Sequence, residues 1–307
     1  MGWRWTIVIG CMALVASGAA QAATLEVGPD KPFKQPSQAI AAAKSGDTVS
    51  IAPGQYYDCA IVRQDGLTIE GAAAGAVMTD TTCAGKAILV IDGNNITVRN
   101  LTLQRARVPD HNGGGIRAEG GNLNIDNVKF LNNEEGILAA DNPNATIRIT
   151  GSEFVHNGAC EGGCAHAVYV GQIHLLHVDH SRFFDTQHTH NIKSRAAATE
   201  VIDCDIQDGP QGTSSFQIDI PIGGSLTVEG STLEKGPNAE NHAFVIIIGE
   251  EGVRQATDKI LIRNNTFTND NEHVTVFLRN LTATPAELVG NKFKGQVRPL
   301  DGDGSVS

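Results

Sequence analysis

The sequence has few aromatic residues and few positive charges. Only 5% of its 307 residues are Phe, Tyr or Trp, whereas 41% are hydrophobic and 34 are glycine. Such a composition suits one large domain built from many small, repeated apolar contacts. The 23 basic residues against 34 acidic ones give a formal net charge of -11, which repels nucleic acid and anionic membrane surfaces. We therefore expect no nucleic-acid partner, and any bound anion must be held by a local group of cations.

Long apolar runs are lacking after residue 23. No later segment approaches the roughly 20 uninterrupted apolar residues that a membrane span needs. Residues 1–23 combine a basic start at Arg4, an apolar stretch over 6–16 and a small-x-small motif at 20–22. This arrangement is typical of a secretory signal peptide. We expect the mature protein to be exported to the periplasm or the medium, without a membrane span, and to be a monomer.

One pattern recurs along the chain at spacings of 24 to 34 residues: three alternating apolar positions, a small or polar pair, and another apolar residue. It is written as ITVRNLTL from Ile96 and as LNIDNVKF from Leu123. The third residue of each copy serves as a marker, and the nine markers are Ile69, Val98, Ile125, Ile149, Val178, Ile202, Val228, Ile262 and Val289. Alternation of period two excludes helix, and a propeller blade needs a longer repeat. Each copy therefore predicts one coil of a parallel β-helix, stacked on the next at roughly 4.8 Å.

The prediction is a single all-β domain over residues 24–295 with about nine to ten coils. A short capping helix is predicted over 36–44, because Ala39, Ile40 and Ala43 share one face and an open solenoid end must be covered. Residues 296–307 are predicted to be a loose polar tail. Most coils contain a second predicted strand, and these strands cover 115–120, 136–141, 166–171, 190–195, 215–220, 242–249 and 273–280.

Five cysteines follow the predicted signal peptide, and export makes disulfides possible. Cys160 and Cys164 bracket the loop CEGGC, whose two glycines allow closure, and Cys59 and Cys83 lie one repeat apart. We expect these two pairs as disulfides, with Cys204 as a small buried core residue. A zinc site at CEGGC is disfavoured, since no second Cys/His pair follows at a zinc-finger distance, and no metal is predicted.

The opening VGPDKPFKQPSQAIAAAKSGDTVSIAPGQY and the repeated coils resemble the right-handed parallel β-helix, pectin-lyase-like superfamily, over nearly all of the mature chain. The resemblance implies this fold and a polysaccharide or oligosaccharide ligand. It implies no particular reaction, because the superfamily includes lyases, hydrolases, epimerases, esterases and non-catalytic proteins. Alginate and chondroitin lyases of this type carry Lys-Ser on a central strand and an arginine on the following coil. Lys193-Ser194 matches the first part, whereas the following strand SFQIDI offers Gln217 and Asp219 in place of arginine.

The stretch HTHNIKSR, residues 188–195, concentrates charge in an acidic chain. If Ile192 and Ser194 face the core, strand alternation makes Lys193 and Arg195 project outward. Neighbouring coils then place Tyr169 beside Lys193 on one side. They place Gln217 and Asp219 on the other side, and Arg117 and Glu119 in the same columns farther along.

These residue types suit β-elimination on a uronate sugar. Arg195 is predicted to pair with the substrate carboxylate, because its planar fork matches two oxygens. Lys193 is predicted to be the base, with its pKa lowered from about 10.4 by Arg195 and by burial. Tyr169 or His190 is predicted to donate the proton to the departing oxygen. The predicted substrate contacts are Gln217, Asp219, His166, His188, Glu119 and Arg117. No cofactor is required, and nothing in the sequence supports calcium.

Other interpretations stay open. Lys193 and Arg195 can be solvated charges, with Asp219 and Arg195 as a structural ion pair. The histidines at 166, 190, 242 and 273 can form a column that binds a transition metal in a non-catalytic periplasmic carbohydrate- or metal-binding protein, or that stacks on sugar rings. A glycoside hydrolase of the same fold can use Glu119 and Asp219 on a neutral glycan.

Overall fold

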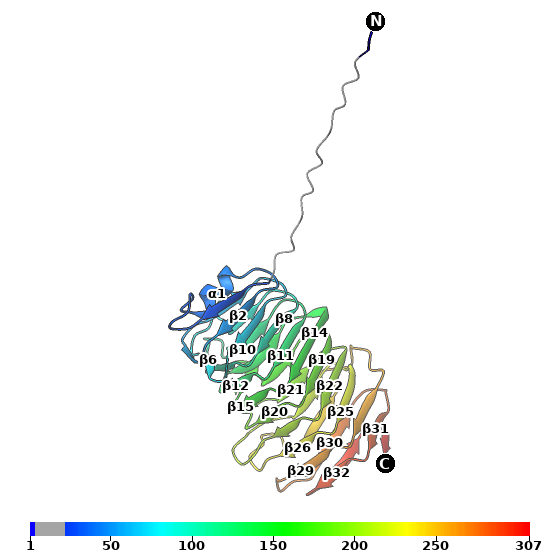
Figure 1. The fold of residues 1–307 in the computed structure, drawn as a ribbon. Helices are drawn as coiled ribbons and strands as arrows, with labels where there is room; N and C mark the ends of the chain where they lie inside the picture. Colours follow the sequence, from blue (N-terminus) through cyan, green and yellow to red (C-terminus); the bar gives the residue numbers. More distant parts are fainter. Residues whose placement is uncertain (4–21) are drawn as a thin grey trace.

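The computed structural model describes residues 1–3 and 22–307. Residues 24–307 form one elongated stack of coils with the N- and C-terminal coils at opposite ends (Figure 1). Most of the predicted signal peptide, residues 4–21, lies outside the described residues. No helix in the described part is long and apolar enough to cross a membrane.

Three parallel sheets form the walls of the stack, and every coil in its middle contributes one strand to each. We call them the marker sheet, the site sheet and the third sheet. The marker sheet contains β1 (Thr24–Val27), β2 (Thr48–Ile51), β5 (Thr68–Gly71), β8 (Ile96–Arg99), β11 (Leu123–Asp126), β14 (Asn142–Thr150), β19 (Ile173–Asp179), β22 (Ala198–Ile202), β25 (Ser225–Glu229), β28 (Ile260–Arg263), β31 (Ala286–Val289) and β34 (Gly304–Val306).

The site sheet contains the second predicted strand of most coils, which comes after both the marker strand and the strand of the third sheet. Its strands are β4 (Ala60–Val62), β7 (Ala87–Ile91), β10 (Gly114–Ala118), β13 (Glu135–Ala139), β18 (Val168–Val170), β21 (Ile192–Ser194), β24 (Ile218–Ile220), β27 (Phe244–Ile248), β30 (Thr275–Asn280) and β33 (Val297–Asp301). All seven predicted second strands are found here, although the structure trims their ends.

The third sheet uses the end of the repeated pattern, after the small or polar pair. Its strands are β3 (Gly54–Tyr56), β6 (Ala76–Thr79), β9 (Thr102–Gln104), β12 (Lys129–Leu131), β15 (Glu153–Val155), β20 (Arg182–Phe184), β23 (Asp205–Gln207), β26 (Thr232–Lys235), β29 (Thr266–Asn269) and β32 (Lys292–Lys294). Asn100 and Asn127 make the bend before it at φ values of 57° and 52°, a left-handed conformation that Asn tolerates.

The marker register is right for seven of the nine coils. Ile69, Val98 and Ile125 pair in sequence, as predicted. In two coils the inward residue is Val201 or Leu288, one position before the predicted marker. Both copies contain adjacent apolar residues, so the pattern alone did not separate the two faces, and a one-residue shift reverses every side chain.

The core is a continuous column of alternating inward residues. Phe130, Phe154 and Phe183 stack in successive coils of the third sheet, with ring centroids 4.6 Å apart in each pair. Beside them the amide of Asn133 donates to the Asn157 side chain of the next coil at 3.1 Å. Repeated contacts of this kind fix the register of the coils, because each coil supplies the same partner to the next.

The two ends of the stack differ in how well the sequence predicted them. Helix α1 (Pro36–Ala42) covers the N-terminal end and buries Ala39 and Ile40, which confirms the capping helix. The loose tail is wrong, because β33 pairs with β30 and β34 with β31, so the C-terminal residues complete a further partial coil.

Both predicted disulfides are present. Cys59 is bonded to Cys83, and Cys160 to Cys164 across the hairpin of β16 (Ala159–Cys160) and β17 (Cys164–Ala165). Cys204 is a buried free thiol, as expected of a core residue.

Candidate functional site

The candidate site lies on the outer face of the site sheet, in its central coils. Strand pairing places five outward residues in one column across successive coils: Arg117, Leu138, Tyr169, Lys193 and Asp219. The sequence predicted this column correctly as far as Lys193 and its two neighbours are concerned.

Lys193 and Arg195 hold a single carboxylate between them. Lys193 Nζ lies 3.0 Å from Glu251 Oε1, and Arg195 Nη2 lies 2.5 Å from Glu251 Oε2. Although partial burial opposes ionisation, hydrogen bonds from Arg195 and Lys193 lower the pKa of Glu251. The two cations therefore already form a binding place for a carboxylate on the face of the sheet.

Glu251 comes from the loop 249–255, which follows β27 and folds back over the site. Gly249 and Gly252 turn this loop at φ values of 90° and 88°. The amide of Glu251 donates to the carbonyl of Pro221 at 2.8 Å, so the loop is fixed to the coil before it.

Asp219 lies beneath this group and is completely buried, and neither of its carboxyl oxygens has a hydrogen-bond partner in the part of the chain that the structure describes. Its Oδ2 is 3.4 Å from Lys193 Nζ and 3.6 Å from His190 Nε2. Burial raises the pKa of Asp219 to about 7, although the Lys193 ammonium opposes the rise. A carboxyl group with this pKa can exchange a proton near neutral pH.

A second column lies beside the first, at the start of the same strands. The rings of His166, His190 and Phe216 stack at centroid distances of 4.8 Å. Each imidazole Nδ1 accepts the backbone N–H of the next ring residue at 3.2 Å, His166 from His190 and His190 from Phe216. Since Nδ1 is the acceptor, the ring proton of each neutral imidazole is assigned to Nε2.

Both imidazoles of this column are kept neutral. Burial, together with repulsion from the nearby Lys193 and Arg195, lowers the pKa of His166 to about 3. Burial also lowers the pKa of His190 well below its usual value, with added repulsion from Lys193. Each ring therefore presents an N–H donor without a charge.

Tyr169 joins the two columns. Its ring meets His166 edge to face at 5.4 Å. Arg195 Cζ and Lys193 Nζ lie 5.2 and 5.9 Å from the Tyr169 centroid, within the range of cation–π attraction. The structure thus brings together all four residues to which the sequence assigned a catalytic role.

One expectation about this group is wrong. The pKa of Lys193 is raised, not lowered: although burial favours the neutral amine, the carboxylates of Asp219 and Glu251 outweigh it. The alternative of a structural ion pair between Arg195 and Asp219 is not found among the described residues, where Arg195 binds Glu251 instead.

Gln217 does not project outward as expected. Its side chain is completely buried, accepts from Asn191 at 2.9 Å and donates to the Glu234 carbonyl. Strands β21 and β24 begin only at Ile192 and Ile218. Gln217 precedes β24, so the alternation of inward and outward side chains along a strand does not apply to it. Gln217 therefore stabilises the bend into the sheet and has no access to a ligand on this face.

Arg117 and Glu119 lie apart from Lys193, with Leu138 and Tyr169 between them in the column. They contact each other, since Arg117 Nε is 3.3 Å from Glu119 Oε1. Glu119 also accepts from Lys86 at 2.7 Å. The pair can contact only a long ligand that extends along the stack.

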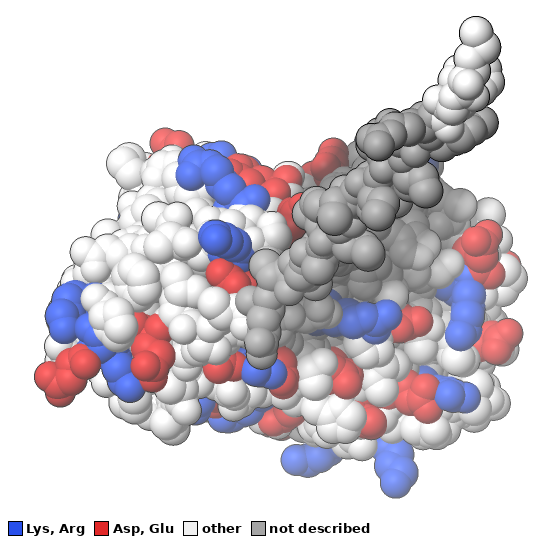
Figure 2. Space-filling view, turned by 45° about the horizontal axis from the view of Figure 1, so that its top comes forward, with Lys and Arg blue, Asp and Glu red and all other residues white. Residues whose placement is uncertain are grey.

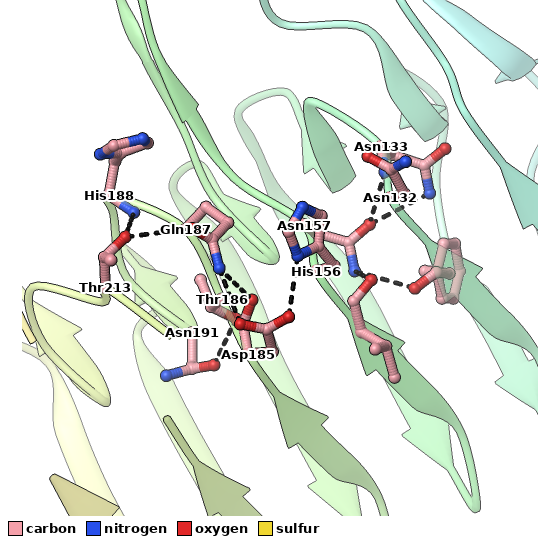
Figure 3. Close-up of polar contacts among 12 residues, drawn as sticks. Asn132, Asn133, His156, Asn157, Asp185, Thr186, Gln187, His188, Asn191 and Thr213 are labelled. Atoms are coloured by element: carbon pink, nitrogen blue, oxygen red, sulfur yellow. Dashed lines mark hydrogen bonds and ion pairs between the residues drawn. The ribbon is translucent and has the colours of Figure 1, made fainter. Parts of the chain in front are cut away.

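His188 faces a neighbouring hollow of about 600 Å³, formed by the turns that lead into the site sheet. It pairs with Glu240 at 2.6 Å, and its backbone N–H donates to Thr213. Figure 3 shows this region, including His156 with its partner Asp185 at 2.8 Å.

The histidine column does not converge on one point. His166 and His190 stack face to face, and His242 and His273 form a separate pair with centroids 4.8 Å apart. Within residues 1–3 and 22–307, no group of three or more His, Cys, Asp or Glu side chains is arranged to hold a metal ion.

Three residues of the site were missed from sequence. Glu250 and Glu251 follow directly after a predicted site-sheet strand, and two acidic residues next to glycine at that place were the available signal. Glu135 begins β13, is buried, and has its pKa raised well above the usual value by that burial. No feature of the sequence around Glu135 indicated that it belongs to the site.

The rest of the surface carries mixed charges. Figure 2 shows basic and acidic side chains next to one another over the face that it presents. Many form pairs across coils, such as Arg99 with Glu70 and Arg263 with Glu229. Such exposed pairs are structural and contribute little individually.

Comparisons with known proteins agree with the architecture. The family model described as "Right handed beta helix region" matches residues 46–187, and no curated protein matches the chain. An alginate lyase from Paenibacillus sp. strain FPU-7 superposes with a TM-score of 0.57 and 16% identity, over 90% of this chain and 99% of the lyase. A lacto-N-biosidase from Eubacterium ramulus superposes with a TM-score of 0.52 and 9% identity, over 92% of this chain and 67% of that one. Identities this low show the fold alone: the chain has the right-handed parallel β-helix, pectin-lyase-like fold.

Proposed function

We propose that this protein is an exported enzyme that binds an acidic polysaccharide across the central coils and cleaves it by β-elimination. The observation that supports this best is the single carboxylate held by Lys193 and Arg195. A uronate carboxylate has the same charge and the same two oxygens as Glu251, so the substrate takes the place of Glu251 between the cations. Neutralising that carboxylate acidifies the proton on C5 of the sugar.

Lys193 acts as the base, with Asp219 as a positioning residue that accepts its proton. The free amine forms when Lys193 passes a proton to ionised Asp219 Oδ2, 3.4 Å away. Because the pKa of Lys193 is raised and that of Asp219 is about 7, this transfer is uphill, and its cost forms part of the activation barrier. The amine then takes the C5 proton, a C4–C5 double bond forms, and the C4–O bond breaks. The departing oxygen receives a proton from Tyr169 or from His190 Nε2.

The direct test is to incubate the purified protein with polymers of mannuronate, guluronate, galacturonate and glucuronate. The unsaturated product of elimination absorbs near ~232 nm, and its appearance distinguishes elimination from other cleavage. Lys193→Ala should abolish the signal while leaving the unfolding temperature close to that of the wild type. No signal with any polymer would contradict the proposal and leave a non-catalytic carbohydrate-binding protein.

A second candidate reaction is hydrolysis, because the two carboxyl groups beside Lys193 differ in ionisation. The pKa of Asp219 is about 7, whereas that of Glu251 is lowered. A proton-donating acid next to an ionised carboxylate is the arrangement that glycoside hydrolases use. New reducing ends without absorbance near ~232 nm would favour hydrolysis. Glu251 would then replace Glu119 as the second carboxylate of the hydrolytic pair with Asp219.

A further inference from the structure

Glu251 occupies a place that an external ligand would need, and the contacts show how it is held there. Its two carboxylate oxygens are divided between the two cations, with Oε1 on Lys193 and Oε2 on Arg195. Both bonds involve charged groups on each side, the stronger class of protein hydrogen bond. Arg195 has no other ion pair among the described residues, so an incoming carboxylate competes directly with Glu251.

The loop that carries Glu251 lies outside the strands, between Gly249 and Gln255, and its residues 250–254 are exposed. Backbone hydrogen bonds tie the loop to the preceding coil, among them those from Glu251 N–H to the Pro221 carbonyl and from Arg254 N–H to the Ile222 carbonyl, both at 2.8 Å. Gly249 and Gly252 make the backbone turns on either side of Glu251. Displacing Glu251 therefore requires rotation of its side chain or the opening of these few loop bonds, and not the unfolding of a core strand.

We propose that Glu251 is a specificity-determining residue that occupies the carboxylate position as an internal competitor, so that only ligands that bring their own carboxylate displace it. This inference rests on the proposed function, because it concerns the same pair of cations. A neutral or esterified sugar cannot replace the charge of Glu251 on Lys193 and Arg195. An acidic sugar can, and the displaced loop then uncovers Asp219.

The test measures binding without turnover. Methyl glycosides of mannuronate, guluronate, galacturonate and glucuronate lack a glycosidic substituent on O4 and so cannot undergo the elimination. Their dissociation constants are measured by NMR titration for the wild type, Glu251→Gln and Asp258→Asn. Asp258 is the control, since it is an exposed carboxylate in the segment that follows the loop and is not part of the site.

The expected result is that Glu251→Gln binds at least one uronoside roughly tenfold more tightly than the wild type, because the competing state is removed. Asp258→Asn should bind as the wild type does, and the methyl esters of the same sugars should gain nothing. Equal or weaker binding by Glu251→Gln, or no binding of any uronoside, would overturn the inference.

A second measurement does not depend on a variant. Saturating the wild type with the uronoside that binds should speed hydrogen exchange of the Glu251 amide, which donates to Pro221 in the free protein. Unchanged exchange would also overturn the inference. If Glu251→Gln binds more tightly but no polymer is cleaved, the proposed β-elimination is refuted and the competitor role of Glu251 stands. If the wild type cleaves a polymer but Glu251→Gln binds no more tightly, the competitor role is refuted and the elimination stands.

Discussion

The carboxyl group of Asp219 lies 3.4 Å from the ammonium group of Lys193, and no hydrogen bond satisfies either of its oxygens. An unsatisfied carboxyl group that is completely buried is costly to the fold. Proteins keep such groups mainly where chemistry requires them. The buried pair of Asp219 and Lys193 is therefore stronger support for a functional site in the central coils than the exposed charged residues are.

Replacing Asp219 by Asn should change how stability depends on pH. A carboxyl group whose pKa rises from 3.8 to about 7 on folding binds a proton in the folded state but not in the unfolded state between these values. Ionisation of Asp219 therefore lowers the free energy of unfolding as pH rises through this window, by up to about 4 kcal/mol in total. Urea unfolding at pH 4 and pH 8 should show Asp219→Asn gaining on the wild type at the higher pH.

The control for this experiment is Asp110→Asn, since Asp110 is exposed. It should follow the wild type at both values. An equal difference between Asp219→Asn and the wild type at pH 4 and pH 8 would show that the carboxyl group does not titrate in this window.

The histidine column should make the protein sensitive to acid. The pKa of His166 falls from 6.5 to about 3 on folding, so the unfolded state binds the extra proton between these values. Stability is therefore complete above about pH 6.5 and falls as pH decreases, by roughly 3 kcal/mol at pH 4. His166→Gln, whose side-chain oxygen can still accept the His190 amide, should lose less stability between pH 7 and pH 4.

His174→Gln serves as the matched variant, because His174 is an exposed histidine on the adjacent marker strand. It should lose as much stability as the wild type on acidification. If His166→Gln behaved in the same way as His174→Gln, the column would not be the source of acid sensitivity.

The phenylalanine stack should contribute strongly to stability. Phe154 is completely buried between Phe130 and Phe183, with centroids 4.6 Å away on both sides. Phe154→Ala leaves a cavity and should cost about 3–5 kcal/mol in the free energy of unfolding. Phe154→Leu should cost clearly less in the same urea titration, and equal losses would mean that stacking and packing there matter little.

The tautomer of His190 is open to direct observation. Its Nδ1 accepts the Phe216 amide at 3.2 Å, which leaves the proton on Nε2. Nitrogen-15 NMR of histidine-labelled protein should show the Nε2–H form at neutral pH, and this signal should persist to pH 5. A signal from the other tautomer would remove His190 as a proton donor at Nε2.

The fold was predictable because the chain repeats its pattern in every coil. Ile69, Val98 and Ile125 mark the same inward position, so each coil independently indicates the register. The prediction was wrong where this redundancy ends. At Gln217 the chain bends before a strand begins, and in the last residues short strands carry no apolar alternation.

The site was only partly predictable, for a different reason. Lys193, Arg195 and Tyr169 lie on strands, and strand register placed them together. Glu251 reaches them from a loop 56 residues beyond Arg195, and no periodicity places a loop side chain. The pKa of Lys193 is raised first by Asp219, which lies on a strand, and further by Glu251 of that loop.

The central claim is that Lys193 and Arg195 recognise a sugar carboxylate. It is tested most directly by comparing the affinity of the wild type for a uronate trisaccharide and for its methyl ester. The ester cannot form a charge-assisted pair with Lys193 and Arg195, so the acid should bind at least about tenfold more tightly than the ester. Equal affinities for the two would contradict the account.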